Sequence, residues 1–279
     1  MAHYQDRFVS VNGLRLHYLE WGSAGKPPFI MLHGGSAYAH WWDWVAPIFA
    51  EDFQVLALDQ RGHGDSQHVD PPAYATRHYL EDLHAFIAAL GLQRPVLMGH
   101  SMGGHNSIIY ATQHAAELGA LVLVDTDAAY PPRAVEFLHK LGEKPAKIFD
   151  SLAEAISRFQ LLPRENFIPP QRLHALAVFA FQQLPDGKWT SKLDRKTLFR
   201  EPVDGLPLLP QITCPTLVVR AEHTPLLSLE KIERLMGGLP NGRWVEVPNT
   251  HHHVMLDNPE GLVQKVRAFL DEVLPGAGQ

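Results

Sequence analysis

The stretch Gly99-His100-Ser101-Met102-Gly103 follows the apolar run 95–98 (PVLM) and matches the pattern G-x-S-x-G. In this pattern a serine occupies a sharp turn from a buried strand into a helix, so its hydroxyl projects beyond the sheet. Glycines two residues to either side allow the strand and the helix to pass closely. The N-terminus of the helix favours the negative charge that develops during attack on a carbonyl. We therefore predict that Ser101 is a nucleophile.

Strand-like and helix-like segments alternate on both sides of this motif. Apolar runs typical of buried strands occupy residues 28–32, 53–59, 95–98, 120–125, 215–220 and 243–247. Helices are expected over residues 77–90, 103–117, 229–236 and 259–273. A hairpin around Asn12-Gly13 opens the chain. This order predicts an α/β fold with a doubly wound, mostly parallel sheet.

The alternation stops from Pro131 to about Pro210, where the segments are helix-like and no buried strand is evident. Residues 171–184 are strongly apolar, and Pro185-Asp186-Gly187 marks a turn. We predict a helical cap over residues 131–210, inserted into a core formed by residues 1–130 and 211–279. The inner face of the cap would line a pocket; simple core packing of the apolar residues is the alternative, and we favour the cap.

Composition limits the partners of this chain. Its 279 residues carry a net charge of −6 with no basic stripe, so nucleic acid is not an expected partner. Cys214 is the only cysteine, so no intrachain disulfide can form. We find no secretory signal and no apolar run of the roughly 18 residues that would span a membrane. We expect a cytoplasmic, membrane-independent monomer or homodimer that acts on a small molecule.

A serine that attacks a carbonyl needs backbone donors for the developing oxyanion. The N–H of Met102, directly after the serine, is the first candidate. The second should come from the loop after an early strand, where His33-Gly34-Gly35-Ser36 is found. We predict the N–H of Gly35, because glycine allows a close backbone approach. A plain tight turn is the alternative.

The serine also needs a base, which is usually a histidine. The chain has 17 histidines, so position is what distinguishes them. Residues 251–253 (HHH) follow the last predicted strand, where the base is expected. Three adjacent histidines also suggest a metal site, but neighbouring side chains point in different directions and no cysteine or paired carboxylate completes it. We therefore predict a catalytic histidine within this trio, and no metal.

The order of these motifs resembles that of the α/β-hydrolase superfamily, in the branch of esterases, lactonases and C–C bond hydrolases with helical caps. The resemblance covers essentially the whole chain. It is carried by residues 32–35 (LHGG), 59–66 (DQRGHGDS), 99–104 (GHSMGG), 121–125 (LVLVD) and 252–259 (HHVMLDNP). His63, in the second of these motifs, would be structural.

The resemblance implies which histidine and which acid complete the triad. The family pattern after the last strand places the base at His252. The usual acid position, after the second-last strand, holds Thr224, which cannot orient an imidazole as a carboxylate does. Some members carry the acid one strand earlier, which corresponds to Asp125. We favour Asp125, with Glu222 as the main alternative; Asp127, or no acid, remains open.

Together these residues predict a carboxylic ester hydrolase that works through an acyl-enzyme on Ser101 and needs no cofactor. A lactone or C–C bond hydrolase could use the same triad. Perhydrolase activity and a ligand-binding protein without catalysis are further alternatives. The apolar cap suggests a largely apolar substrate of medium size.

Overall fold

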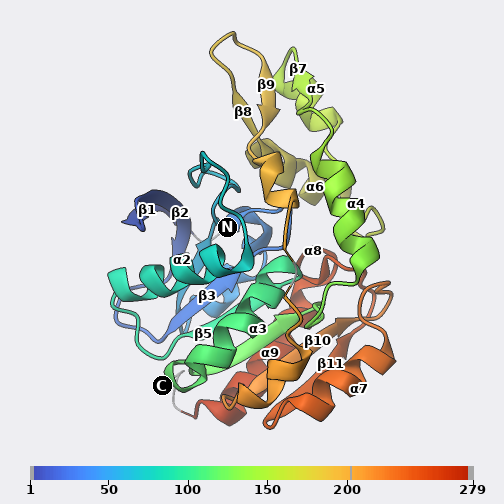
Figure 1. The fold of residues 1–279 in the computed structure, drawn as a ribbon. Coiled ribbons are helices and arrows are strands. Elements are labelled where there is room, and N and C mark those ends of the chain that lie inside the picture. Colours follow the sequence, from blue (N-terminus) through green and yellow to red (C-terminus); the bar gives the residue numbers. More distant parts are fainter. Residues whose placement is uncertain (1–2, 202, 276–279) are drawn as a thin grey trace.

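The computed structural model describes residues 3–201 and 203–275, and its main feature is a sheet of eight strands (Figure 1). In spatial order the strands are β1 (Gln5–Val11), β2 (Leu14–Trp21), β4 (Gln54–Leu58), β3 (Pro28–Leu32), β5 (Val96–His100), β6 (Ala120–Val124), β10 (Thr216–Ala221) and β11 (Gly242–Val247). β2 is antiparallel to both its neighbours, and the other five strand pairs are parallel. This confirms the predicted α/β-hydrolase fold.

Successive residues of the central strands face opposite sides of the sheet. In β3, Phe29 and Met31 pack into one hydrophobic core, whereas Ile30 and Leu32 pack into another. Helices cover both faces, which explains why these strands are apolar at every position. The helices of the core are α1 (Ala46–Phe49), α2 (Thr76–Ala89), α3 (Met102–His114), α7 (Leu229–Gly238), α8 (Val254–Asp257) and α9 (Pro259–Val273), with 3₁₀-helices η1 (Ala39–Trp42), η2 (Ala115–Glu117) and η5 (Leu206–Gln211).

The segment between β6 and η5 stands above one edge of the sheet (Figure 1). Its elements are α4 (Pro132–Gly142), β7 (Ile148–Phe149), α5 (Leu152–Ser157), α6 (Pro170–Ala177), η3 (Val178–Ala180), β8 (Phe181–Gln183), β9 (Trp189–Ser191) and η4 (Arg195–Leu198). η5 then returns to the core, where Leu209 is fully buried. The division into a core of 1–130 and 211–279 and a cap of 131–210 stays a prediction.

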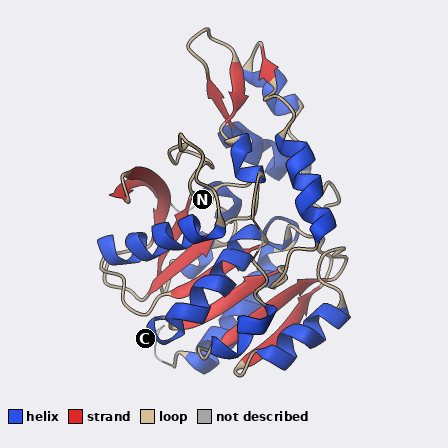
Figure 2. Cartoon of the chain, in the orientation of Figure 1, coloured by secondary structure: helices blue, strands red, loops and turns tan. Residues whose placement is uncertain are grey.

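The inserted segment contains helices, as predicted, and also short strands that the sequence did not indicate. Strands β7, β9 and β8 form a small antiparallel sheet at its tip (Figure 2). The strands are two or three residues long, too short to show the alternation that marks a strand in a sequence. The apolar stretch 171–184 is divided accordingly among α6, η3 and β8. The turn at Pro185-Asp186-Gly187 connects β8 to β9, with Gly187 at φ 84°.

No helix among residues 3–201 and 203–275 is both long enough and apolar enough to cross a membrane.

The aromatic group near the start of the chain belongs to the core. Trp42 is completely buried, and Tyr38 and Trp41 are at least 95% buried. None of these three side chains lines the cavity described below. These three side chains therefore pack in the core.

Candidate active site

Ser101 lies where β5 meets α3, in a strained backbone conformation with φ 50° and ψ −112°. Its N–H donates to the carbonyl of Val124 in the neighbouring strand, and its carbonyl accepts a bond of 2.7 Å from the Thr126 hydroxyl. A methyl group on Gly103 would overlap the carbonyl oxygens of Leu32 and His33. The second glycine of the motif is therefore required for α3 to pack against the end of β3.

The loop after β3 is held rigidly beside this turn. The ring of His33 bonds to the carbonyl of Gly34 through Nδ1 (2.8 Å) and accepts from the N–H of Gln60 at Nε2 (3.0 Å). The Gln60 amide group also donates to the carbonyl of His33. A Cβ placed on Gly35 would lie 3.9 Å from the Cβ of Met102, so the two predicted oxyanion donors belong to adjoining segments.

Asp125 follows β6 and is completely buried. β6 lies between β5, which leads to Ser101, and β10, which leads to Thr224. The Asp125 carboxylate accepts from the N–H of Ala221 at 3.2 Å and from the Thr224 hydroxyl at 2.7 Å. The residue in the family's usual acid position is therefore a hydrogen-bond donor to the carboxylate on the neighbouring strand.

His252 belongs to the loop after β11 and is 97% buried, with Nδ1 at 2.7 Å from Asp125 Oδ2. If the proton is on Nδ1, it is donated to the carboxylate, and Nε2 is left as the free base. The ring of His100 fixes the backbone here, because its Nε2 lies 2.8 Å from the carbonyl of His252. Burial lowers the pKa of His100 well below the usual value, and the nearby rings of His252 and His253 lower it further.

The other two candidate acids lie elsewhere in the structure. The Glu222 carboxylate accepts from the N–H of Asn249 at 2.7 Å and is partly exposed. Asp127 forms an ion pair of 2.9 Å with Lys231. Neither carboxylate is hydrogen-bonded to His252, whose ring nitrogen Nδ1 is occupied by Asp125.

The three histidines of the trio have separate partners. His253 bonds through Nε2 to the carbonyl of Pro163 at 2.9 Å, and burial lowers its pKa to about 3. The backbone N–H of His251 donates to the carboxylate of Asp257 at 2.7 Å. The rings of the trio do not converge on a shared point with other ligand groups of the described residues.

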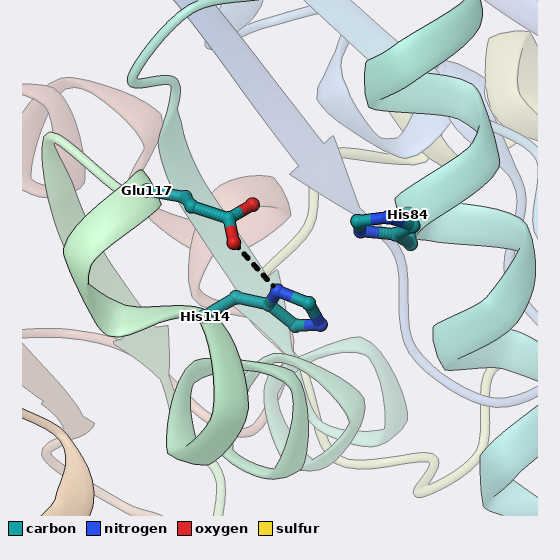
Figure 3. A group of neighbouring side chains, drawn as sticks. All are labelled: His84, His114 and Glu117. Atoms are coloured by element: carbon teal, nitrogen blue, oxygen red, sulfur yellow. Dashed lines mark hydrogen bonds and ion pairs between the residues drawn. The ribbon is translucent and has the colours of Figure 1, made fainter.

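Two groups of metal-type ligands among the described residues lie outside this site, and one of them is at the far end of α3. His84, His114 and Glu117 bring their ligand atoms within 4.8 Å of one another (Figure 3). The two rings stack at 4.8 Å with an angle of 28° between their planes, and His114 is hydrogen-bonded to Glu117 at 3.0 Å. Stacked imidazoles direct their in-plane lone pairs alongside each other rather than at one ion, so the stacking and the hydrogen bond account for this group.

The predicted site residues share one cavity of about 430 Å³ beneath the cap segment. Gly35, Ser101, Met102, Asp125 and His252 all contribute to its wall. The cap segment supplies apolar side chains, namely Pro131, Ala134, Phe137, Leu138, Leu162, Pro163 and Leu198. The cavity also contains Arg200, which the sequence analysis did not single out, because an isolated arginine in a cap carries no motif.

A sheet of this order, with a serine at the strand–helix turn and a histidine–aspartate pair beside it, is the arrangement of an α/β hydrolase. The family model described as alpha/beta hydrolase fold matches residues 27–259, and the chain belongs to this family.

Named relatives extend the comparison. The chain is 29% identical to the N-formylmaleamate deformylase of Pseudomonas putida, over 95% of this chain and 96% of that protein. It is 26% identical to the 2-hydroxy-6-oxo-6-(2'-aminophenyl)hexa-2,4-dienoic acid hydrolase of Metapseudomonas resinovorans, over 96% of this chain and 91% of that protein. The crystal structure of E-2-(acetamidomethylene)succinate hydrolase superposes with a TM-score of 0.85 at 24% identity, covering 96% of this chain and 100% of that one. These relatives are hydrolases.

Proposed function

We propose that the protein is a serine hydrolase that cleaves a carboxylic ester through an acyl-enzyme on Ser101. One observation carries the proposal. Ser101 and His252 line the same cavity, and His252 is hydrogen-bonded to a fully buried carboxylate, that of Asp125, at 2.7 Å. A buried histidine–carboxylate pair beside a strained serine is the arrangement that nucleophilic acyl transfer requires.

In the first half of the proposed reaction, Nε2 of His252 takes the proton of the Ser101 hydroxyl as Oγ bonds to the substrate carbonyl carbon. The N–H groups of Gly35 and Met102 hold the resulting oxyanion. The bond from carbon to the alcohol oxygen then breaks, and His252 returns the proton to that oxygen. In the second half, water loses a proton to His252 and attacks the acyl carbon, and Ser101 regains its proton. The net reaction consumes one water and needs no cofactor.

A second candidate is the hydrolysis of a carbon–carbon bond by the same residues. The similarity to the 6-oxo-dienoic acid hydrolase favours it. A ketone has no heteroatom leaving group, so hydrolysis at its carbonyl carbon must break a carbon–carbon bond. This candidate shares the attack at a carbonyl and differs in the leaving group, which would depart as a carbanion that requires protonation.

The test is a panel of p-nitrophenyl esters of rising acyl length, assayed with the wild type and with Ser101→Ala. We expect the wild type to release p-nitrophenol with kcat/KM at least 10³-fold above that of Ser101→Ala, because the variant cannot form the acyl-enzyme. Equal rates in both proteins would show that the turnover does not use Ser101. A wild type that cleaves no ester in the panel but cleaves a vinylogous 6-oxo acid would favour the second candidate.

A further inference from the structure

Arg200 places a guanidinium group in the wall of the catalytic cavity. It lies beside the loop after β3 (residues 33–36), which we call the oxyanion loop. The residue follows η4 in the segment that returns from the cap to the core, and it lines the cavity together with Ser101 and Met102. Its Nη2 atom lies 3.9 Å from the position that a Cβ on Gly35 would take. The positive charge therefore lies within a few bond lengths of the point where a substrate carbonyl would bind.

The charge of Arg200 has no anionic partner among residues 3–201 and 203–275, because no carboxylate of that part lies within 4.0 Å of it. The second cation of the cavity wall differs, since Lys231 is paired with Asp127 at 2.9 Å. The Asp125 carboxylate is committed to His252 and Thr224. The guanidinium lies 5.7 Å from the ring of Tyr79, which offers a cation–π contact but no charge.

Three buried histidines and one tyrosine near Arg200 have pKa values shifted towards their neutral forms. Burial lowers the pKa of His33 and lowers that of His63 well below its usual value, and Arg200 adds to both effects. Burial also lowers the pKa of His105 to about 4, again with a contribution from Arg200. The pKa of Tyr130 is raised by burial, although Arg200 opposes the rise. The cavity wall also contains the Asp125 carboxylate and the pair of Asp127 with Lys231. Each of these charges already has a partner, so Arg200 is the cation of the wall for which the described residues supply no carboxylate within 4.0 Å.

We propose that Arg200 binds a carboxylate of the substrate, so that the preferred substrates are short-chain esters that carry a free carboxylate a few bonds from the scissile carbonyl. An arginine in a largely apolar cavity binds a carboxylate with two parallel charge-assisted hydrogen bonds. The proposal rests on the proposed function, because the scissile carbonyl is positioned by Ser101. It deepens that function by naming the chemical class of the acyl group.

A different role for the same residue makes a different prediction. A guanidinium near the oxyanion loop could simply stabilise the oxyanion of every substrate. Its removal would then lower kcat for neutral and anionic substrates alike. A carboxylate-binding residue acts on anionic substrates alone, and the two roles separate in a comparison of matched substrates.

The experiment compares monoethyl succinate with ethyl succinamate, which differ only in the exchange of a carboxylate for a neutral amide, and follows ethanol release. We expect the wild type to favour the acid in kcat/KM by roughly 10- to 100-fold, the range of charge-assisted hydrogen bonds. Arg200→Gln should reduce this ratio to about one by lowering the rate on the acid alone. The double variant Asp127→Asn/Lys231→Gln removes the other cation of the cavity together with its partner carboxylate, so it leaves the net charge unchanged. It is the matched control and should preserve the ratio.

A wild-type ratio near one, or an equal loss on both substrates in Arg200→Gln, would overturn the proposal. Calorimetry with monoethyl succinate and the Ser101→Ala protein tests binding without turnover. If Ser101→Ala binds monoethyl succinate and Ser101→Ala/Arg200→Gln does not, the role of Arg200 is supported. This holds even if the wild type hydrolyses no ester, and in that case only the proposed function fails. No detectable difference between these two proteins contradicts the role of Arg200 and leaves the proposed function unaffected.

Discussion

At the scale of single residues, Asp125 joins the end of β6 to β10 and to the loop that follows β10. It lies at φ 43°, and its carboxylate is reached from β10 by the N–H of Ala221 and the hydroxyl of Thr224. These donors satisfy a buried carboxylate that also bonds to His252. A buried charge of this kind is stable only when its hydrogen bonds are made. Thr224 therefore supports the acid instead of supplying it.

We expect Asp125→Asn to lower kcat on an ester substrate by about 10³- to 10⁴-fold, because an amide cannot hold His252 in the tautomer that leaves Nε2 free. Glu222→Gln should stay within about twofold of the wild type, since Glu222 bonds to the N–H of Asn249. Steady-state kinetics of the wild type and the two variants shows whether Asp125 or Glu222 is the acid of the triad. A large loss in Glu222→Gln alone would contradict the assignment.

The double variant Asp125→Asn/Thr224→Asp provides a control for this prediction. It moves the carboxylate to the position that the family commonly uses, one strand away and adjacent to the original group. A partial recovery of kcat over Asp125→Asn would show that the carboxylate charge, and not a general disturbance of packing, is what the single variant has lost.

From the sequence, the acid of the triad could be narrowed to a few candidates, but the choice among them could not be made. Asp125, Glu222 and Asp127 all follow strands that end at the same edge of the sheet, so spacing alone leaves each within reach of His252. The choice depends on which carboxylate is buried and which is already paired, as Asp127 is with Lys231. Arg200 was missed for the same reason, because its significance depends on the described residues placing no carboxylate within 4.0 Å of it in three dimensions.

At the scale of elements, the turn from β5 into α3 depends on the close approach of α3 to β3. Gly103→Ala should destabilise the protein by more than about 3 kcal/mol, or prevent folding, because the new methyl group meets backbone carbonyls that cannot move aside. Gly237→Ala in α7 is the matched control, since a methyl group there has no neighbour within 4 Å. It should leave stability unchanged or raise it by up to about 1 kcal/mol.

Urea unfolding of both glycine variants, followed by circular dichroism, measures these changes. A Gly103→Ala protein as stable as the wild type would mean that α3 can shift away from β3, and the account of this turn would be wrong.

The elements of the core were predictable because their signals are local. The predicted helix at 77–90 is α2 (Thr76–Ala89), and the predicted helix at 259–273 coincides with α9. The strands of the cap segment were not predictable, because Ile148–Phe149 pairs with Trp189–Ser191 across some forty residues. Pairing of such short strands is decided by tertiary contacts and not by the pattern within each strand.

At the scale of the whole molecule, five buried histidines make stability depend on pH. Burial is the largest cause that lowers the pKa of His33, His63, His100, His105 and His253. Below about pH 6.5 the unfolded chain protonates these rings, whereas the folded protein keeps them neutral until lower pH. The unfolded state therefore binds more protons in this range, and the free energy of unfolding falls as the pH decreases.

Between pH 6.5 and 5.5, we expect the free energy of unfolding to fall by roughly 1 kcal/mol for each histidine that stays neutral. His17 opposes this effect. Burial is the largest single influence and lowers its pKa, but the hydrogen bonds and charges of Asp59 and Asp6 together raise it above the usual value. Its stabilisation is therefore largest below pH 6.5. The urea concentration at the midpoint of unfolding, measured at pH 7.5, 6.5 and 5.5, tests whether the five buried histidines outweigh His17. A midpoint that rises on acidification would contradict the neutral state of the buried rings.

The central claim is that Ser101 is the nucleophile, and covalent labelling with a fluorophosphonate probe, followed by peptide mapping, tests it most directly. The account predicts one adduct per chain on Ser101, at least 10²-fold slower labelling of Asp125→Asn, and none of Ser101→Ala in its folded state. A folded wild type that takes up no probe, or an adduct on another residue that persists in Ser101→Ala, would contradict it.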